Sequence, residues 1–281
     1  MKETLKDSVY SIIYESVGDF FQHTNYENPP ATMNSSNQSN YREVKGNSAW
    51  RYGVEESKEK YHKTRFDPEK GKKICEEAVK KIKASSEYKK HLSLAMTYRK
   101  KIRFEDHGSR LSVPKAIAGE DKYFSVFKNT KRPIVKIAIN ICGSACVNDD
   151  DFRKVAEAAI PTIYMLEQAG ISTEVWYTSF SAGTHPTIKY TGVHVKIKSA
   201  QQRFNWTTFA PVFCLGSYRE SIFLSWIYSE HGVGYGLGTP MESRDIKKLN
   251  NFGYNAVIGL NSPGPMKTIS ELFDIIKKTS A

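Results

Sequence analysis

The residues best placed to do chemistry follow directly on the apolar, β-branched run 134–141. The end of this run and the turn after it contain Asn140, Cys142, Gly143 and Ser144. Carboxylates and hydroxyls at such alternating positions would bind a hard cation such as Mg²⁺, which prefers oxygen ligands. In this chain the alternating positions instead hold an amide and a thiol, and a thiol is a poor ligand for a hard cation. We therefore expect a neutral turn without a metal.

A glycine-rich stretch, 231–239, could present bare backbone N–H groups to an anion. It follows an expected helix rather than a strand, and no Lys-Ser/Thr pair closes it, so it matches neither nucleotide-binding fingerprint. We expect a loop before a capped helix, with Gly236, Gly238 and Thr239 as the residues that would contact an anion at the helix N-terminus.

Positive charge is concentrated in the N-terminal part of the chain. Residues 1–132 contain 27 Lys and Arg against 18 Asp and Glu, whereas residues 133–281 contain 14 against 12. The field of such a surface attracts phosphates or an acidic partner. The alternative is a solvated helix face, on which interleaved glutamates pair with the lysines. The residues that would bind phosphate are Lys72, Lys73, Lys80, Lys81, Lys89, Lys90, Arg99, Lys100, Lys101 and Arg103.

Several classes of protein are excluded by what the sequence lacks. No apolar run approaches the ~18 residues of a membrane span. The four cysteines have no paired zinc spacing, which indicates free thiols in a reducing cytosol. Neither a Gly-x-Ser-x-Gly elbow nor a His-Glu-x-x-His helix is present. We therefore expect no catalytic residues, no metal and no cofactor.

From residue 133 onward, expected strands and helices alternate. A strand at 134–141, a helix with the acidic residues 149–151 at its start and its end at Gly170, and a strand at 173–178 form a βαβ unit, which requires a parallel pair. Further strands are expected at 189–198, at the sheet edge, and at 256–260; the remaining helices lie at 218–229 and after the capping patterns at Ser199, Thr239 and Thr268. Residues 133–281 are therefore expected to form a Rossmann-like α/β domain, a mostly parallel sheet flanked by helices.

The part before residue 133 is expected to be a basic, partly helical extension. Residues 1–24 would contain a short amphipathic helix over 9–14, and the polar stretch 25–48 would be a linker. Residues 49–132 would form a basic helical region. Within it, a helix is expected from Pro68, with its apolar stripe at Ile74, Ala78, Val79 and Ile82, and a second helix over 86–99.

The turn after the first strand resembles the metal-ion-dependent adhesion site of von Willebrand factor A-like (vWA-like) domains, whose signature there is Asp-x-Ser-Gly-Ser. Asn140 stands in place of the aspartate, Cys142 in place of the first serine, and Ser144 alone matches. In the bacterial subgroup of these domains, hydroxyl residues at the end of the second strand assist the ion, and Thr178 and Ser179 occupy a similar place. The resemblance implies a vWA-like fold with a degenerate ion site.

A narrower resemblance rests on three landmarks, 50–57 (WRYGVEES), 111–120 (LSVPKAIAGE) and the Asn140 turn. Together they look like a phage-encoded family of vWA-like proteins of unknown function. This resemblance implies a viral origin and a place in the host cytoplasm, and it leaves open whether the protein enters the virion.

These observations predict a protein that binds another macromolecule and is not an enzyme. The expected partner is a viral or host protein, because vWA-like domains are interaction modules. The alternative is a nucleic-acid-binding protein, for DNA or RNA, that acts through the basic N-terminal region. No membrane is involved in either case. The sequence leaves the identity of the partner and the oligomeric state open.

Overall fold

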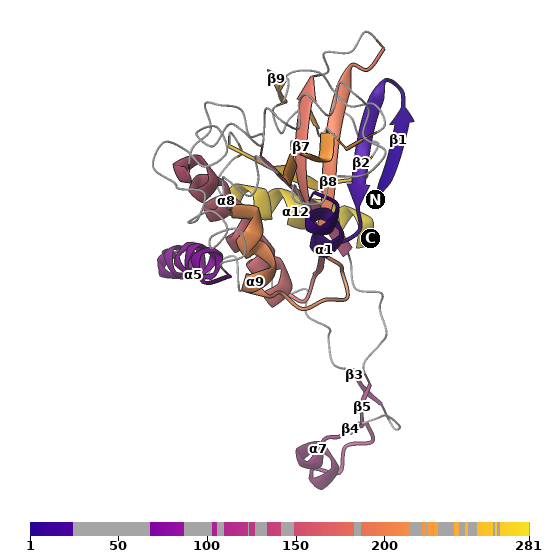
Figure 1. Ribbon diagram of the computed structural model, residues 1–281. Helices are drawn as coiled ribbons and strands as arrows, with labels where there is room; N and C mark the ends of the chain where they lie inside the picture. Colours follow the sequence, from indigo (N-terminus) through magenta and orange to yellow (C-terminus); the bar gives the residue numbers. More distant parts are fainter. Residues whose placement is uncertain are drawn as a thin grey trace.

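The protein is built around one mixed β-sheet flanked by helices, an α/β architecture (Figure 1). The computed structural model describes residues 1–24, 68–86, 103–105, 110–122, 124–126, 134–141, 149–182, 187–213, 221–222, 224–226, 228–229, 239–241, 245–246, 252–260, 262 and 265–280. None of the helices in these ranges is both long and apolar enough to cross a membrane.

The main sheet has the order β1-β2-β8-β7-β6-β10, and β9 pairs with β7 outside this path. Its strands are β1 (Lys2–Lys6), β2 (Val9–Tyr14), β6 (Ile134–Asn140), β7 (Ser172–Ala182), β8 (Tyr190–Lys198), β9 (Thr239–Pro240) and β10 (Ala256–Ile258). The pairs β2–β8, β6–β7 and β6–β10 are parallel, whereas β1–β2, β7–β8 and β7–β9 are antiparallel. The α/β class is confirmed, but a mostly parallel, Rossmann-like sheet is not, because the sheet is partly antiparallel.

The predicted βαβ unit is present at the centre of this sheet. β6 leads into α8 (Asp149–Gln168), and β7 then pairs in parallel with β6. α8 buries an apolar stripe that includes Phe152, Val155 and Ile163, and this stripe belongs to the same core cluster as Val135 and Ile137 of β6. Burial of these side chains holds α8 on one face of the sheet.

Other helices join α8 around this core. They are α1 (Val17–His23), α5 (Pro68–Ala84), α9 (Trp206–Phe209), the 3-10 turn Ala210–Phe213, and α12 (Pro265–Ser280). α5 contacts α8 and α9, and α12 contacts α8. Ala78 and Val79 of α5 are buried, and Ile74 and Ile82 pack against the core at its border. The predicted helix from Pro68 and its apolar stripe are confirmed, so part of the basic N-terminal region belongs to the core.

The helix predicted over residues 9–14 is wrong, because these residues form strand β2. Tyr10, Ile12 and Tyr14 point into the main core, whereas Val9 and Ile13 contact apolar clusters on the other side of the sheet. Burial on both faces removes the polar–apolar alternation that marks a half-exposed strand. The helical part of residues 1–24 is α1, which begins after Ser16, whose Oγ accepts a hydrogen bond from the Asp19 amide (3.0 Å).

The place predicted for the strand at 189–198 is also wrong. β8 is an interior strand between β2 and β7, antiparallel to β7, and most of its side chains are buried. The N-terminal hairpin β1–β2 supplies the neighbour that local sequence pattern did not predict.

The three predicted capping patterns do not begin helices where they were expected. Gln202 Oε1 accepts from the Ser199 amide (2.8 Å), but the chain turns there and α9 begins only at Trp206. Thr239 pairs with β7 as part of β9, and Thr268 is buried inside α12, which begins three residues earlier. The expected helix at 218–229 is helical at 221–222 and 224–226, and 25–48 and 87–99 lie outside the described residues.

A second, small sheet lies apart from the main one in Figure 1. It contains β3 (Arg103–Glu105), β5 (Phe124–Val126) and β4 (Arg110–Leu111), in that order and antiparallel, with α7 (Val113–Ile117) beside it. The 111–120 landmark lies here, and Leu111, Val113 and Ile117 are exposed.

The turn of the β1–β2 hairpin offers a stabilising substitution. Asp7 and Ser8 both have positive φ (50° and 63°), a conformation that favours glycine at the second position. Ser8→Gly is expected to stabilise the fold by about 0.5–1 kcal/mol, because it relieves the left-handed strain. Denaturant unfolding would measure the gain, and Ser8→Ala, which keeps a Cβ, should give none. A lower unfolding midpoint for Ser8→Gly would contradict this account of the turn.

Candidate functional site

The carboxyl end of β6 holds Asn140 beside Thr178 of β7, its partner in the parallel register. Thr178 Oγ1 donates to Asn140 Oδ1 (3.4 Å), and Asn140 Nδ2 donates to the Met241 carbonyl (3.3 Å). The Met241 amide in turn donates to the Phe180 carbonyl (3.1 Å). Asn140 is only 5% exposed. Its amide therefore ties the end of β6 to the segment that follows β9.

These hydrogen bonds explain why an amide, rather than a carboxylate, suits this position. Asn140 uses its nitrogen as a donor to a backbone carbonyl, a role that an aspartate oxygen cannot take. An aspartate here would place two acceptors face to face in a buried setting, at a cost of about 1–3 kcal/mol. Among the described residues, no group of three or more His, Cys, Asp and Glu side chains is placed to hold a metal ion.

The other predicted residues of this turn are only partly brought together. Ser179 follows Thr178 on the strand, so its side chain points to the opposite face from Asn140. The hydroxyl that joins Asn140 is therefore that of Thr178, and the assignment of Ser179 to this site is wrong. Cys142, Gly143 and Ser144 lie outside the described residues.

The predicted anion site is not at a helix N-terminus. Thr239 lies in strand β9, in register with Ala182 of β7. The sequence pattern Thr-Pro-x-Glu is typical of a helix start, but pairing with β7 takes precedence here. Gly236 and Gly238 lie outside the described residues.

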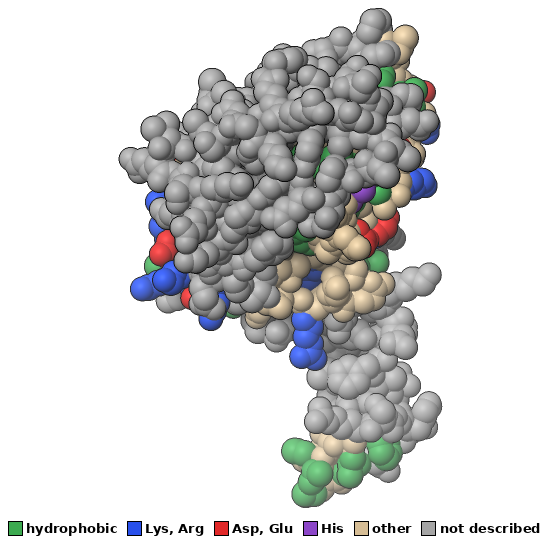
Figure 2. Space-filling model, viewed as in Figure 1, with side chains coloured by type: hydrophobic (Ala, Val, Ile, Leu, Met, Phe, Trp, Pro, Cys, Tyr) green, Lys and Arg blue, Asp and Glu red, His purple; other side chains and the backbone are tan. Residues whose placement is uncertain are grey.

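Of the predicted phosphate-binding residues, five lie in the part of the chain that the structure describes, four on α5 and one in the small sheet. Lys72, Lys73, Lys80 and Lys81 lie on α5, where Lys81 forms an ion pair with Glu157 of α8. Arg103 begins β3 in the small sheet, and Lys89, Lys90, Arg99, Lys100 and Lys101 lie outside the described residues. Figure 2 shows Lys and Arg beside Asp and Glu at the left edge of the molecule, where Figure 1 places α5.

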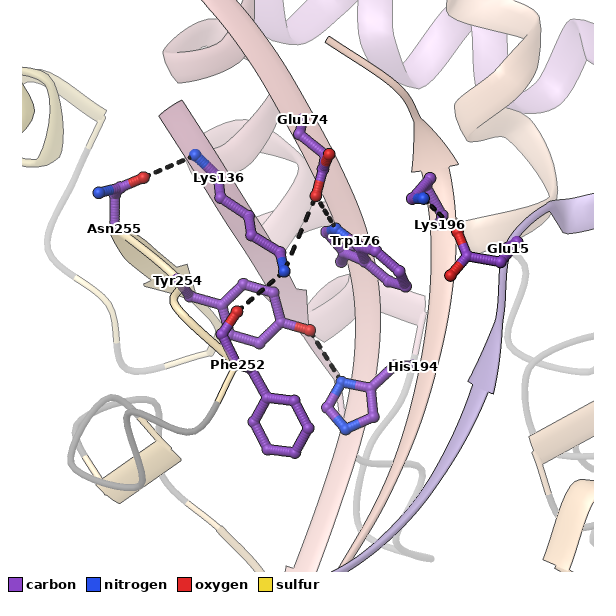
Figure 3. A network of polar contacts seen from close by, with 9 residues as sticks. All are labelled: Glu15, Lys136, Glu174, Trp176, His194, Lys196, Phe252, Tyr254 and Asn255. Carbon is purple, nitrogen blue, oxygen red and sulfur yellow. Dashed lines mark hydrogen bonds and ion pairs between the residues drawn. The ribbon is translucent and has the colours of Figure 1, made fainter. Parts of the chain in front are cut away.

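The richest polar network of the described residues lies on the sheet face opposite α8 and was not predicted (Figure 3). Lys136 of β6 is its centre. Its amide donates to Asn255 Oδ1 (2.8 Å), its carbonyl accepts from the Asn255 amide (2.8 Å), and its Nζ donates to the Phe252 carbonyl (2.9 Å). One lysine thus holds residues 252–255 against the sheet by three hydrogen bonds.

Trp176 of β7 lies between two lysines in the same network (Figure 3). Lys136 Nζ and Lys196 Nζ lie 5.0 Å and 4.8 Å from the centre of the indole ring. Trp176 Nε1 donates to Glu174 (2.6 Å), which lies 3.8 Å from Lys136 Nζ, and Lys196 pairs with Glu15. Cation–π contacts with the two lysines stabilise the sheet at this position. Because Trp176 is only 6% exposed, its ring cannot stack on a nucleic-acid base.

His194 of β8 is a buried titratable group on this face. Its Nδ1 lies 2.8 Å from Tyr254 Oη. The rings of Phe180 and Phe252 pack against the imidazole, with 4.8 Å and 4.1 Å between the ring centres. Its Nε2 has no hydrogen-bond partner among the described residues. Burial, with a smaller contribution from Lys136, lowers the pKa of His194 from 6.5 to about 3. The imidazole is therefore neutral at neutral pH.

An ion pair between the buried Lys198 and the partly buried Glu167 joins the end of α8 to the sheet. Lys198 Nζ donates to Glu167 Oε1 (2.8 Å) and to the carbonyls of Thr173 (2.8 Å) and Ser199 (3.2 Å). Glu167 Oε1 also accepts from the amide (3.0 Å) and hydroxyl (2.6 Å) of Thr173. All three ammonium protons of Lys198 are therefore donated, and its side chain is only 2% exposed. The pair holds α8, β7 and β8 together.

The comparisons with known proteins identify a family but no activity. No curated protein and no solved structure matches the chain. A family model described as a domain of unknown function (DUF7192) matches residues 2–263. The match begins in β1 and extends beyond β10, so it includes the N-terminal hairpin together with the main sheet. The chain belongs to this family, the domain of unknown function DUF7192.

Proposed function

We propose that the chain is a non-enzymatic, vWA-like module that binds another protein without a metal ion. The viral origin and the host-cytoplasmic setting implied by the sequence resemblance are part of this proposal. The finer, vWA-like assignment is supported by the β6–α8–β7 unit, which places Asn140, at the carboxyl end of β6, beside Thr178 of the parallel strand β7.

The observation that carries the proposal is the use made of the Asn140 side chain. In vWA-like domains the corresponding carboxylate binds an ion that a partner's carboxylate completes. Here both ends of the Asn140 amide are occupied by Thr178 and by the Met241 carbonyl. A partner would therefore bind through surface contacts whose strength does not depend on Mg²⁺ or Mn²⁺.

Asn140→Asp tests the first half of this proposal. The substitution removes the donor to Met241 and is expected to destabilise the protein by about 1–3 kcal/mol. Asn255→Asp is the matched control, because Asn255 Oδ1 acts as an acceptor from the Lys136 amide and an aspartate keeps that role. Thermal unfolding with and without Mg²⁺ or Mn²⁺ would measure both variants, and the wild type should show no shift with either ion. A rise in the wild-type Tm with Mg²⁺ would overturn the proposal.

Affinity purification of the full chain from infected cells tests the second half. A protein partner is expected to remain bound in EDTA and at raised salt, because neither an ion nor phosphate contacts hold it. Release of the partner by EDTA would contradict an ion-independent interface.

A second candidate function, nucleic-acid binding, is favoured by the exposed lysines of α5. Lys73 and Lys80 are exposed on this helix, although Glu76 and Glu77 lie among them and are exposed too. Such binding predicts retention on a polyanion column that falls steeply with salt, and earlier elution when Lys73 and Lys80 are changed to Gln. Elution that is unaffected by these changes would remove α5 as a nucleic-acid surface.

A further inference from the structure

Residues 252–255 cover His194 on the sheet face opposite α8 (Figure 3). The ring is 1% exposed and is packed between Phe180, Phe252 and Tyr254. Its Nε2 faces Gly192, where an added Cβ would lie only 3.0 Å from that nitrogen. The imidazole therefore fills a closed space, in which its second nitrogen has no hydrogen-bond partner among the described residues.

The groups around this ring cannot accommodate an imidazolium. From residues 252–255, Tyr254 Oη can accept one N–H, at Nδ1. From β6, Lys136 adds a like charge, and from β8, Lys196 lies two residues along the same side of the strand. From β7, the Glu174 carboxylate is engaged by Trp176, and from β2 the residue in register is the apolar Ile13. Among the described residues, a proton on His194 would thus find no acceptor for its second N–H and no carboxylate free to compensate its charge.

We propose that His194 is an acid-sensitive latch, whose protonation releases residues 252–255 from the sheet. The bonds that would open are those of the segment itself: the Asn255 backbone amide to the Lys136 carbonyl, the Lys136 amide to Asn255 Oδ1, the Lys136 ammonium to the Phe252 carbonyl, and the bond between His194 and Tyr254. Release would uncover Trp176 and Ala138, which form an apolar cluster with Tyr254. Acid would therefore expose an aromatic surface on a sheet that otherwise stays intact.

The direction of the pH effect follows from the pKa. In the closed arrangement burial lowers the pKa of His194 from 6.5 to about 3. The free energy by which the neutral ring stabilises the closed arrangement is fully present above pH 6.5 and is lost as the pH falls toward 3. Over this window the open fraction should increase about tenfold for each pH unit.

Hydrogen exchange between pH 7 and pH 4.5, read by mass spectrometry and corrected for the intrinsic rate, tests this proposal in the full chain. The reporter is the Asn255 amide, which donates to the Lys136 carbonyl, and the reference is the β6–β7 ladder. The wild type is expected to lose Asn255 protection about tenfold per pH unit while the ladder stays protected. His194→Asn, which keeps an amide for Tyr254 Oη but does not titrate, should abolish this slope.

Tyr254→Phe is the second variant, and it keeps His194 while removing the hydrogen bond. It is expected to open more at neutral pH and to keep the tenfold slope. An unchanged slope in His194→Asn would overturn the proposal. So would loss of protection in Asn255 and in the β6–β7 ladder together, because acid would then unfold the whole sheet rather than release one segment.

Discussion

Lys198→Met is expected to destabilise the protein by about 3 kcal/mol, because it leaves the partly buried Glu167 carboxylate without its cation. The carbonyls of Thr173 and Ser199 also lose their hydrogen-bond donor, the Lys198 ammonium, because methionine has none. For a chain of this size the change corresponds to a fall in Tm of about 10 °C. Calorimetry or denaturant unfolding would measure it.

Lys81→Met is the matched control for this prediction. Lys81 also forms an ion pair between two elements, with Glu157, but its side chain is 65% exposed. Pairs of that kind contribute about 0–1 kcal/mol, so the control should be nearly neutral. Equal losses for the two variants would show that burial of the Lys198 pair does not decide its contribution.

Gly192→Ala is expected to destabilise the protein by about 1–3 kcal/mol, through a clash inside the sheet. An added Cβ would lie 2.7 Å and 2.9 Å from two atoms of the Phe180 ring and 3.0 Å from His194 Nε2. The ring cannot move easily, because it also packs against Phe252 and belongs to a buried cluster. Denaturant unfolding would report the loss as a lower midpoint.

Two comparisons separate this clash from a general effect of replacing glycine. Gly18→Ala in α1 places its Cβ 3.7 Å from the nearest atom, Ser16 Oγ, and should be neutral or slightly stabilising. Phe180→Leu replaces the ring that the new Cβ meets with a shorter side chain. In that background, Gly192→Ala should therefore destabilise the protein less than it does in the wild type. Purely additive losses in the double variant would contradict the clash.

The part of the fold that could be predicted from the sequence is the part set by local pattern. The apolar run 134–141, the acidic start of the next helix and its stop at Gly170 each indicate one element, and β6, α8 and β7 follow them closely. Gly170 has φ +78°, the left-handed conformation with which many helices end. Short connections then make the parallel pairing of β6 with β7 predictable.

The rest of the sheet depends on partners that are distant in the sequence. The run 9–14 has no alternation because apolar clusters cover it on both faces of the sheet, so it does not differ from a short apolar helix by pattern alone. In the same way, Thr239 has the local signature of a helix cap, but the edge of β7 offers it backbone hydrogen bonds.

The candidate site shows the same division. The position of Asn140 at the end of a buried strand was predictable. The role of its amide was not, because the acceptor is the Met241 carbonyl about 100 residues later. Lys198 and His194 look like ordinary polar residues of a strand, and their burial is set by Glu167 and by Tyr254. The one local signal was Lys136, a single charge inside an apolar run.

The place of the first hairpin has a consequence for how the protein is made. Val9 of β2 pairs in register with Tyr190 of β8, a partner that the ribosome adds about 180 residues later. At common translation rates, β2 would wait about 10–40 s before its neighbour exists. During that interval the side chains of Tyr10, Ile12 and Tyr14 have no core to bury them. We therefore expect a chaperone to bind the nascent chain at this strand.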